Sequence, residues 1–305
     1  VDITSNDTTN QESQFSGFIA FSEPANCYDV KITSTGVLYA SLGGKVYVSD
    51  NGDPTKLVNR SIYPDNEDFV RKDNIQWTSN VVITDKQGNV LYQGGSTTNE
   101  LIDWHTDYAY AEDMRLEEYP SSEDAGRIEF AVAPSNESVV YAMAAKESNP
   151  NRNSLLAIYM TEDNGNSWRV VAPGGSPSLN ILGSSYGANV SYFQGDYNNS
   201  LVVFPNNPYR IIAGGVDLWL GEKVNESGYY NWSQKSNGQA ATIGGIYSPY
   251  YCHMDHHIYA FKPTNANKLY IGTDGGVYLA SLSGADFSFQ SINKNYNAAQ
   301  FYTLD

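Results

Sequence analysis

Three of the four histidines of this chain lie in one short stretch, His253-Met254-Asp255-His256-His257. If this stretch is a β-strand, alternation places His253, Asp255 and His257 on one face. Imidazole and carboxylate groups are the ligands that zinc and other transition metals prefer. The stretch therefore predicts a divalent metal site or contact with a substrate. The third interpretation is a purely structural network in which the imidazoles bond to backbone carbonyls.

A second group of ionisable residues lies in segment 99–124, which carries nine carboxylates with Arg115 as its one Lys or Arg. Within it His105 stands between Asp103 and Asp107. A run of this kind is ordinarily a solvated acidic loop. The alternatives are an oxygen-rich site for a cation such as calcium and a contact surface for a basic partner.

Charge and composition exclude several classes of function. The 305 residues include 18 Lys+Arg and 34 Asp+Glu, which gives a net charge of -16 and disfavours nucleic-acid binding. No apolar run approaches the roughly 18 residues of a membrane-spanning helix. A glycine-rich phosphate loop and a Gly-x-Ser-x-Gly nucleophile elbow are both missing from the sequence, so NTPase and α/β-hydrolase chemistry are disfavoured. No catalytic residue is identified.

The elements that must position these groups are predicted to be β-strands throughout. Short β-branched or aromatic runs alternate with turns rich in Gly, Asn and Asp, which is the pattern of β-hairpins. Glycine supplies the positive φ that tight hairpin turns require. Three hairpins are predicted in this way, over Gly36–Val48 around Gly43-Gly44-Lys45, over Asn80–Gly94 around Lys86–Asn89, and over Leu269–Ala280 around Asp274–Gly276.

A second pattern occurs three times, as an apolar strand, a proline, an Asn-rich turn and another apolar strand. Proline at a strand end lacks the N–H that a ladder needs, and Asn tolerates the left-handed backbone of a turn. The copies are Phe130–Tyr141, Val203–Ala213 and Phe261–Tyr270, with Pro134, Pro205 and Pro263. The prolines are 71 and 58 residues apart, so loops are expected between repeated antiparallel units of about 40–50 residues.

The sharpest local motif is Thr161-Glu162-Asp163-Asn164-Gly165-Asn166-Ser167-Trp168. We expect Asp163 to accept hydrogen bonds from following amides, Gly165 to take a conformation that Cβ forbids, and Trp168 to fold back as an apolar plug. Ser167 completes the pattern Ser/Thr-x-Asp-x-Gly-x-Ser/Thr-Trp. A degenerate copy keeps Asp50 and Gly52 but has Val48 at the leading hydroxyl position, and Gly272–Gly276 is a weaker one. We interpret these motifs as structural.

This motif resembles the Asp box of bacterial neuraminidase-type repeats. Together with the strand-Pro-Asn-strand units and the segment His253–Ala280, it resembles the Asp-box and sortilin-like β-propeller proteins of secreted or surface type in Bacteroidetes. The resemblance implies an all-β propeller of four-stranded antiparallel blades at the cell surface or outside the cell, with type IX secretion as the route. The predicted domains are a flexible segment 1–14 and a propeller of about five or six blades over 15–305.

The end of the chain leaves two alternatives open. Asn295–Leu304 resembles the sequence with which the next blade begins in that group of proteins. This resemblance implies that the chain is an incomplete part of a larger propeller with further blades or domains. Alternatively the last strand pairs with residues 15–21 and closes the ring. Truncation is the favoured alternative. Cys27 and Cys252 fit no CxxC metal or redox site and are either buried thiols or one disulfide.

We therefore expect a binding or scaffold module for a protein or glycan, with loops such as 99–124 and 172–200 as the recognition surface. The alternative is a carbohydrate-active enzyme similar to xyloglucanases, which need two carboxylates across a cleft. Sialidase activity is disfavoured because the chain has only seven arginines and Gly126-Arg127-Ile128-Glu129 lacks the proline of the sialidase motif. Neither a membrane span nor a nucleic-acid partner is expected.

Overall fold

The computed structural model describes residues 26–60, 82–84, 90–93, 124–149, 151–174, 181–183, 193–223, 230–238 and 250–294. Within these ranges the secondary structure is almost entirely β, with one 3-10 turn, η1 (Pro54–Lys56), and no α-helix. Segment 1–14, residues 99–123 of the acidic segment and the ending Asn295–Leu304 lie outside the described residues. No helix in the described part has the length and apolar character needed to cross a membrane.

Four antiparallel sheets of four strands each form the body of the molecule. The first two contain β1 (Cys27–Ile32), β2 (Leu38–Leu42), β3 (Lys45–Ser49) and β4 (Val58–Asn59), then β7 (Ala125–Val132), β8 (Val140–Lys146), β9 (Leu155–Thr161) and β10 (Arg169–Pro173). The other two contain β11 (Ser200–Phe204), β12 (Asn207–Gly214), β13 (Leu218–Lys223) and β14 (Tyr230–Gln234), then β15 (His256–Lys262), β16 (Asn265–Thr273), β17 (Gly276–Ser283) and β18 (Asp286–Ser291).

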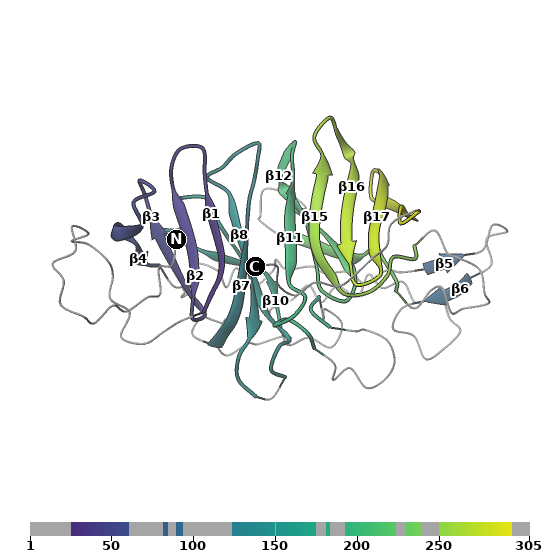
Figure 1. The fold of residues 1–305 in the computed structure, drawn as a ribbon, viewed down its shortest axis with the longest axis horizontal. Helices are drawn as coiled ribbons and strands as arrows, with labels where there is room; N and C mark the ends of the chain where they lie inside the picture. Colours follow the sequence, from purple (N-terminus) through teal and green to yellow (C-terminus); the bar gives the residue numbers. More distant parts are fainter. Residues whose placement is uncertain are drawn as a thin grey trace.

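Each sheet is an up-and-down meander whose first strand lies innermost, as in a blade of a β-propeller (Figure 1). Strand β1 lies beside β7, β7 beside β11, and β11 beside β15. The predicted all-β fold with four-stranded antiparallel blades is therefore confirmed. We call the sheets the first to fourth blades. The expected total of five or six blades stays a prediction, and a separate pair, β5 (Val82–Thr84) and β6 (Val90–Gln93), forms the hairpin expected over Asn80–Gly94.

The glycine and proline signals mark the hairpins. Strands β2 and β3 are joined by Gly43 and Gly44, which have φ of 55° and 74°. These values fit a two-residue hairpin turn, which only glycine adopts readily at both positions. The three proline units all join the first and second strands of a blade, β7 to β8, β11 to β12 and β15 to β16. The repeated units predicted from the sequence are therefore equivalent hairpins.

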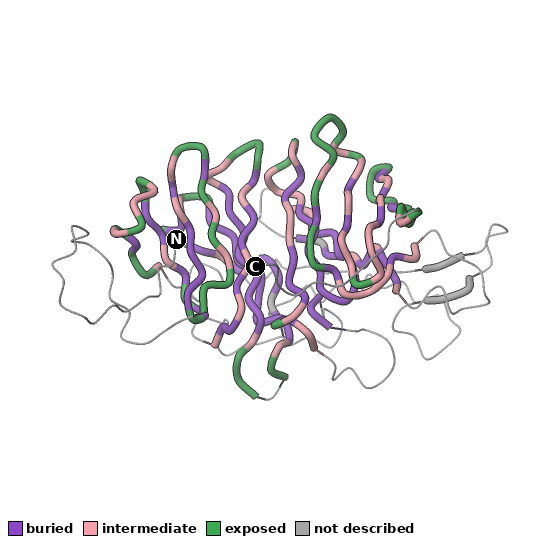
Figure 2. Tube along the Cα trace, viewed as in Figure 1, coloured by how far each residue is buried: buried purple, intermediate pink, exposed green. Residues whose placement is uncertain are grey.

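The hydrophobic core lies between neighbouring blades, where alternate residues of both sheets face each other. One buried cluster joins the first and second blades and includes Tyr39, Phe130 and Trp168. A second joins the second and third blades, and a third joins the third and fourth. Figure 2 shows the buried positions along the strands and the exposed ones at many hairpin tips. This packing fixes the four inner strands relative to one another.

Candidate functional site: a cavity among the inner strands

A cavity of about 480 Å³ lies among the four inner strands. Each of the four described blades contributes its first strand to the lining. Lys31 comes from β1, Glu129 from β7, Ser200 from β11 and His257 from β15. Asn199, which directly precedes β11, also lines the cavity. The fold thus collects ionisable and hydrogen-bonding groups from positions up to 228 residues apart in the chain, Lys31 and Tyr259.

Glu129 is the carboxylic acid in the described lining of the cavity, and its side chain is only 16% exposed. Arg127 lies two residues earlier on the same strand and points to the same face. Its Nε and Nη2 atoms lie 2.9 and 2.8 Å from Glu129 Oε1. Burial raises the pKa of Glu129 to about 7, although the charge of Arg127 opposes the rise. Glu129 therefore changes charge near neutral pH.

Asp29 on β1 lies close to Glu129 and adds to the rise of its pKa. The Asp29 carboxylate accepts backbone hydrogen bonds from Val30, on Oδ1, and from Phe130, on Oδ2, each at 2.8 Å. It also forms an ion pair with Lys31. Because Phe130 belongs to β7, Asp29 ties the inner strand of the first blade to that of the second. The Lys31 ammonium is thereby paired within the protein.

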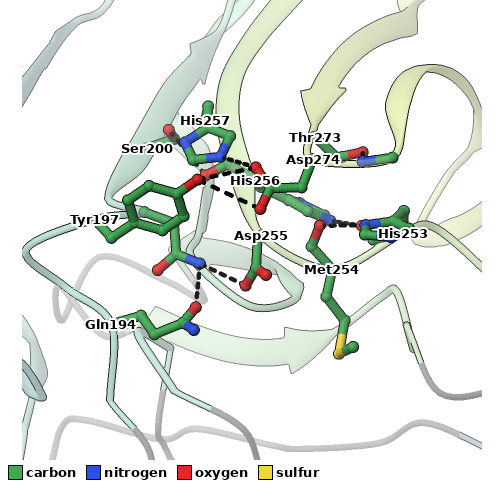
Figure 3. A network of polar contacts seen from close by, with 12 residues as sticks. Gln194, Tyr197, Ser200, His253, Met254, Asp255, His256, His257, Thr273 and Asp274 are labelled. Atoms are coloured by element: carbon green, nitrogen blue, oxygen red, sulfur yellow. Dashed lines mark hydrogen bonds and ion pairs between the residues drawn. The ribbon is translucent and has the colours of Figure 1, made fainter. Parts of the chain in front are cut away.

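His257 forms the opposite wall and is held by a carboxylate (Figure 3). Its Nε2 atom lies 2.7 Å from Oδ1 of Asp274, which stands in the turn between β16 and β17. The hydroxyl of Tyr197 donates to the same carboxylate at 3.2 Å, and its ring packs edge-on against the imidazole with centroids 4.9 Å apart. The Asp274 and Tyr197 contacts therefore fix the orientation of His257.

Asp255 lies behind this group and has a left-handed backbone, with φ of 63°. Its Oδ1 accepts a hydrogen bond of 2.8 Å from Nδ2 of Asn198, which also donates to Oε1 of Gln194 at 2.7 Å. Burial raises the pKa of the Asp255 carboxyl, and the nearby charge of Asp274 raises it further. The contacts join the segment before β11 to the start of the fourth blade.

The predicted metal site assumed that His253, Asp255 and His257 lie on one strand and share one face. Strand β15 begins only at His256, so this assumption is wrong for His253 and Asp255. The left-handed Asp255 breaks the extended run, and Nδ1 of His253 contacts the carbonyl of Met254 at 2.8 Å. Among the described residues no group of three or more His, Cys, Asp or Glu is arranged to hold a metal ion. A site at His253, Asp255 and His257 stays a prediction, which metal analysis of wild-type protein against His253→Ala/His257→Ala would test.

The middle histidine of the stretch, His256, is fully buried. Its Nε2 atom donates to the carbonyl of His253 at 2.9 Å, because a carbonyl can only accept. Its Nδ1 atom then accepts from the hydroxyl of Tyr259 at 2.8 Å. Burial lowers the pKa of His256 to about 3, so it is a neutral, structural histidine. This is the carbonyl-bonded network that the sequence offered as an alternative.

The motif around Asp163 forms the turn between β9 and β10. Asp163 Oδ1 accepts from the amide of Ser167 at 2.8 Å and from the hydroxyl of Thr161 at 2.8 Å. Gly165 has φ of 79°, and Trp168 is 6% exposed, packed between the first and second blades. Burial acts to raise the pKa of Asp163, but the hydrogen bonds from Ser167 and Thr161 outweigh it and lower the pKa overall. The motif serves packing and lies outside the cavity lining.

The degenerate copy occupies the corresponding turn of the first blade, after β3. Gly52 has φ of 71°. Asp50 pairs with Arg60 at 2.7 Å, and Arg60 also donates to the carbonyl of Asn164 at 2.7 Å. The two motifs are therefore linked across the interface of the first and second blades.

Cys27 is exposed and Cys252 is buried, and both are free thiols rather than a disulfide.

No local pattern marks Glu129 or Lys31 as a site residue, whereas Asn199 and Ser200 fall at the end of the segment 172–200 that was expected to take part in recognition. Glu129 is one of 34 acidic residues, and nothing local marks it. Arg127 and Glu129 occupy alternate positions of one strand and so share a face, which is visible in the sequence. That this face lines a cavity becomes apparent only when the strand is known to be the inner strand of its blade.

The sequence matches no family model and no curated protein. Several solved structures show distant likeness, and three of them are described below. Sqt1 from Chaetomium thermophilum has 11% identity and a TM-score of 0.33, over 55% of this chain and 36% of its own. A GH74 enzyme of Niastella koreensis has 13% identity and a TM-score of 0.27, over 90% and 44%. PorZ, a surface component of the type IX secretion system of Porphyromonas gingivalis, has 10% identity and a TM-score of 0.17, over 87% and 36%. This chain spans less than half of each, and similarity at this level transfers no function.

Proposed function

We propose that this β-propeller is a binding module that holds a saccharide segment of a glycan in the cavity among its inner strands. The observation that carries the proposal is the lining, which combines internally paired ionisable groups, hydrogen-bonding side chains and aliphatic side chains. The wider role is that of an extracellular or cell-surface scaffold, as the sequence resemblance implies. Detection of the native protein by antibody in medium and surface fractions of its cells tests that location.

The size of the cavity suits a small ligand or the end of a larger one. Ligand pockets commonly have volumes of about 300–1,000 Å³, and this cavity has about 480 Å³. It is built from strands rather than loops, so its walls are held by the cores between blades. A site of this kind is largely formed before the ligand arrives, which reduces the entropic cost of binding.

The charges of the lining favour a ligand without net charge. Lys31 is paired with Asp29 and Glu129 with Arg127, and His257 is hydrogen-bonded to Asp274. An incoming ion would compete with a partner that is already in place and would itself lose its hydration. A neutral hydroxyl group meets no such cost, because it can donate to a carboxylate oxygen and accept from an ammonium or an amide.

Aliphatic groups complete the match to a sugar. Ile32 on β1 and Ile258 on β15 both line the cavity, and each is 63% exposed. Exposed apolar side chains beside convergent polar groups are typical of ligand sites. A sugar ring offers C–H surface to the isoleucines and hydroxyls to the polar groups, so both parts of the lining are used.

A carbohydrate-active enzyme is the second candidate, and the pKa of Glu129 favours it. A carboxyl group with pKa of about 7 can act as a general acid at neutral pH. Two-carboxylate hydrolysis requires a partner across the sugar, and Glu129 is the only carboxyl residue in the described part of the lining. His257, oriented by Asp274, is another ionisable side chain of the lining. Binding is therefore the better supported function.

The test is binding of neutral and acidic oligosaccharides on an array, followed by calorimetry of the best ligand. Ile258→Glu places a charge in the cavity and should weaken binding by at least about tenfold, a difference that calorimetry measures readily. Val58→Glu is the matched control, because Val58 is 55% exposed on β4 and does not line the cavity. Equal losses in both variants, or no binding of any neutral saccharide, would contradict the proposal. Release of reducing ends that Glu129→Gln abolishes would instead support the enzyme.

A further inference from the structure

We propose that Arg127 is a positioning residue. It couples Glu129 in the cavity to a path of polar contacts that runs through Tyr197 and Asp274 to His257, so that protonation of Glu129 weakens ligand binding. The inference rests on the proposed function for its ligand, but the coupling itself can be measured without one. Arg127 is not among the residues that line the cavity, so it acts through its neighbours.

The Arg127 guanidinium makes contacts on two sides. Its Nε and Nη2 atoms face Glu129 Oε1, as described above. Its Nη1 atom donates to the carbonyls of Asp196 and Tyr197, at 3.1 and 2.9 Å. One planar, permanently charged group therefore joins the cavity carboxyl on β7 to the segment that leads into β11. The side chain is 23% exposed, so its geometry is set by these partners.

The contacts continue from Tyr197 to the far wall. Its hydroxyl donates to Asp274, which holds His257, and its ring packs against that imidazole (Figure 3). Glu129 and His257 line the cavity on different blades, and this path connects them around its edge. A change at Arg127 therefore reaches both walls through groups that are in direct contact.

The segment between these contacts is tightly held. Asn198 is fully buried and bonded to Gln194 and Asp255, and Asn199 is 2% exposed with its amide 3.4 Å from the carbonyl of Met143. A packed segment moves as a unit rather than absorbing a displacement locally. A shift of the Tyr197 carbonyl is therefore expected to move the Asn199 side chain in the cavity.

The charge of Glu129 determines how strongly its carboxyl group holds Arg127, which is the first contact of this path. The charged groups that face Glu129 are Arg127 on its own strand and Asp29 and Lys31 on β1, and the titratable thiol of Cys27 on β1 also interacts with it. Neighbouring β11 offers uncharged Ser200, preceded by Asn199, and β15 offers His257 on the same cavity. When Glu129 binds a proton, its ion pair with Arg127 is lost, and the hydrogen bonds from the guanidinium to the neutral carboxyl group are weaker. Arg127 then depends more on the carbonyls of Asp196 and Tyr197.

The first experiment needs no ligand. Amide NMR signals of residues 196–198 are followed from pH 5 to 9 in wild-type protein, Glu129→Gln and Glu147→Gln. The control Glu147 also pairs with an arginine, Arg152 at 2.8 Å, but both side chains are 54% exposed. We expect a titration centred near pH 7 in wild type and Glu147→Gln that is lost in Glu129→Gln. Persistence of the titration in Glu129→Gln, or its absence from wild type, would overturn the coupling.

The second experiment measures the affinity for the best array saccharide at pH 8 and pH 5.5. Wild type should bind about fivefold more weakly at pH 5.5, and Arg127→Ala about tenfold more weakly at pH 8 with no further change at pH 5.5. Arg127→Lys should restore part of the pH dependence, and the exposed control Arg152→Ala should match wild type. If Arg127→Ala keeps the wild-type profile, the coupling is wrong although binding stands. If no saccharide binds while the amides titrate as expected, the proposed function is wrong and the coupling stands.

Discussion

Replacing Glu129 by glutamine should change how the stability of the protein depends on pH. The pKa of Glu129 is raised by burial from 4.5 to about 7. Between these two values the folded protein holds a proton that the unfolded chain has released. The free energy of unfolding of the wild type therefore falls as pH rises through this window, and the loss persists above pH 7.

The size of the effect follows from the shift. At about 1.4 kcal/mol per pKa unit, a rise from 4.5 to about 7 corresponds to roughly 3 kcal/mol between pH 4.5 and pH 8. Glutamine keeps the shape of the protonated side chain and has no such proton. The advantage of Glu129→Gln over wild type should therefore grow by roughly 3 kcal/mol across the window.

The assay is urea unfolding, followed by tryptophan fluorescence at pH 4.5, 5.5, 6.5 and 8. Glu147→Gln is the control, since that side chain is 54% exposed and its difference from wild type should vary little with pH. A difference between Glu129→Gln and wild type that stays constant within about 0.5 kcal/mol over the whole range would refute the reasoning.

Three further predictions concern the frame, each measured by urea unfolding. Gly44→Ala should destabilise the protein well beyond the roughly 1 kcal/mol of left-handed strain, because its Cβ would overlap the carbonyl oxygen of Ala125. Gly284→Ala, with φ of 63° and open space around it, should show the strain alone. Asp163→Ala should cost about 0.5–1.5 kcal/mol by removing the hydrogen bonds that close its turn, whose donors water can reach. Trp232→Phe should cost more, about 1–3 kcal/mol, because its fully buried Nε1 donates to the carbonyl of Val171 across a blade interface at 2.9 Å.

The blades could be predicted from local signals because their hairpins depend on a few residue types. Gly43 and Gly44 both take positive φ, and Pro134, Pro205 and Pro263 all follow the inner strand of a blade. Such residues act through their own backbone, so the sequence reports them directly. The number of blades and the closure of the ring depend on contacts between distant strands, and local patterns do not encode them.

The cavity could not be predicted for the same reason. Glu129 acquires its raised pKa from burial among strands of different blades, and its sequence neighbours look like those of any other strand carboxylate. The histidine stretch shows the converse. Alternation of side chains holds within a strand, but the left-handed backbone of Asp255 lies just before the strand begins. The contact with Asn198 fixes the side chain of Asp255, and the contact with Asp274 fixes that of His257.

The most direct test of the proposed binding site is a crystal structure of this protein with the saccharide that binds best on the array. We predict a sugar ring among the inner strands, with hydroxyls on Glu129 and His257 and its C–H face on Ile32 or Ile258. A saccharide bound on the outer strands or the connecting loops, with the cavity among β1, β7, β11 and β15 unoccupied, would contradict the proposal.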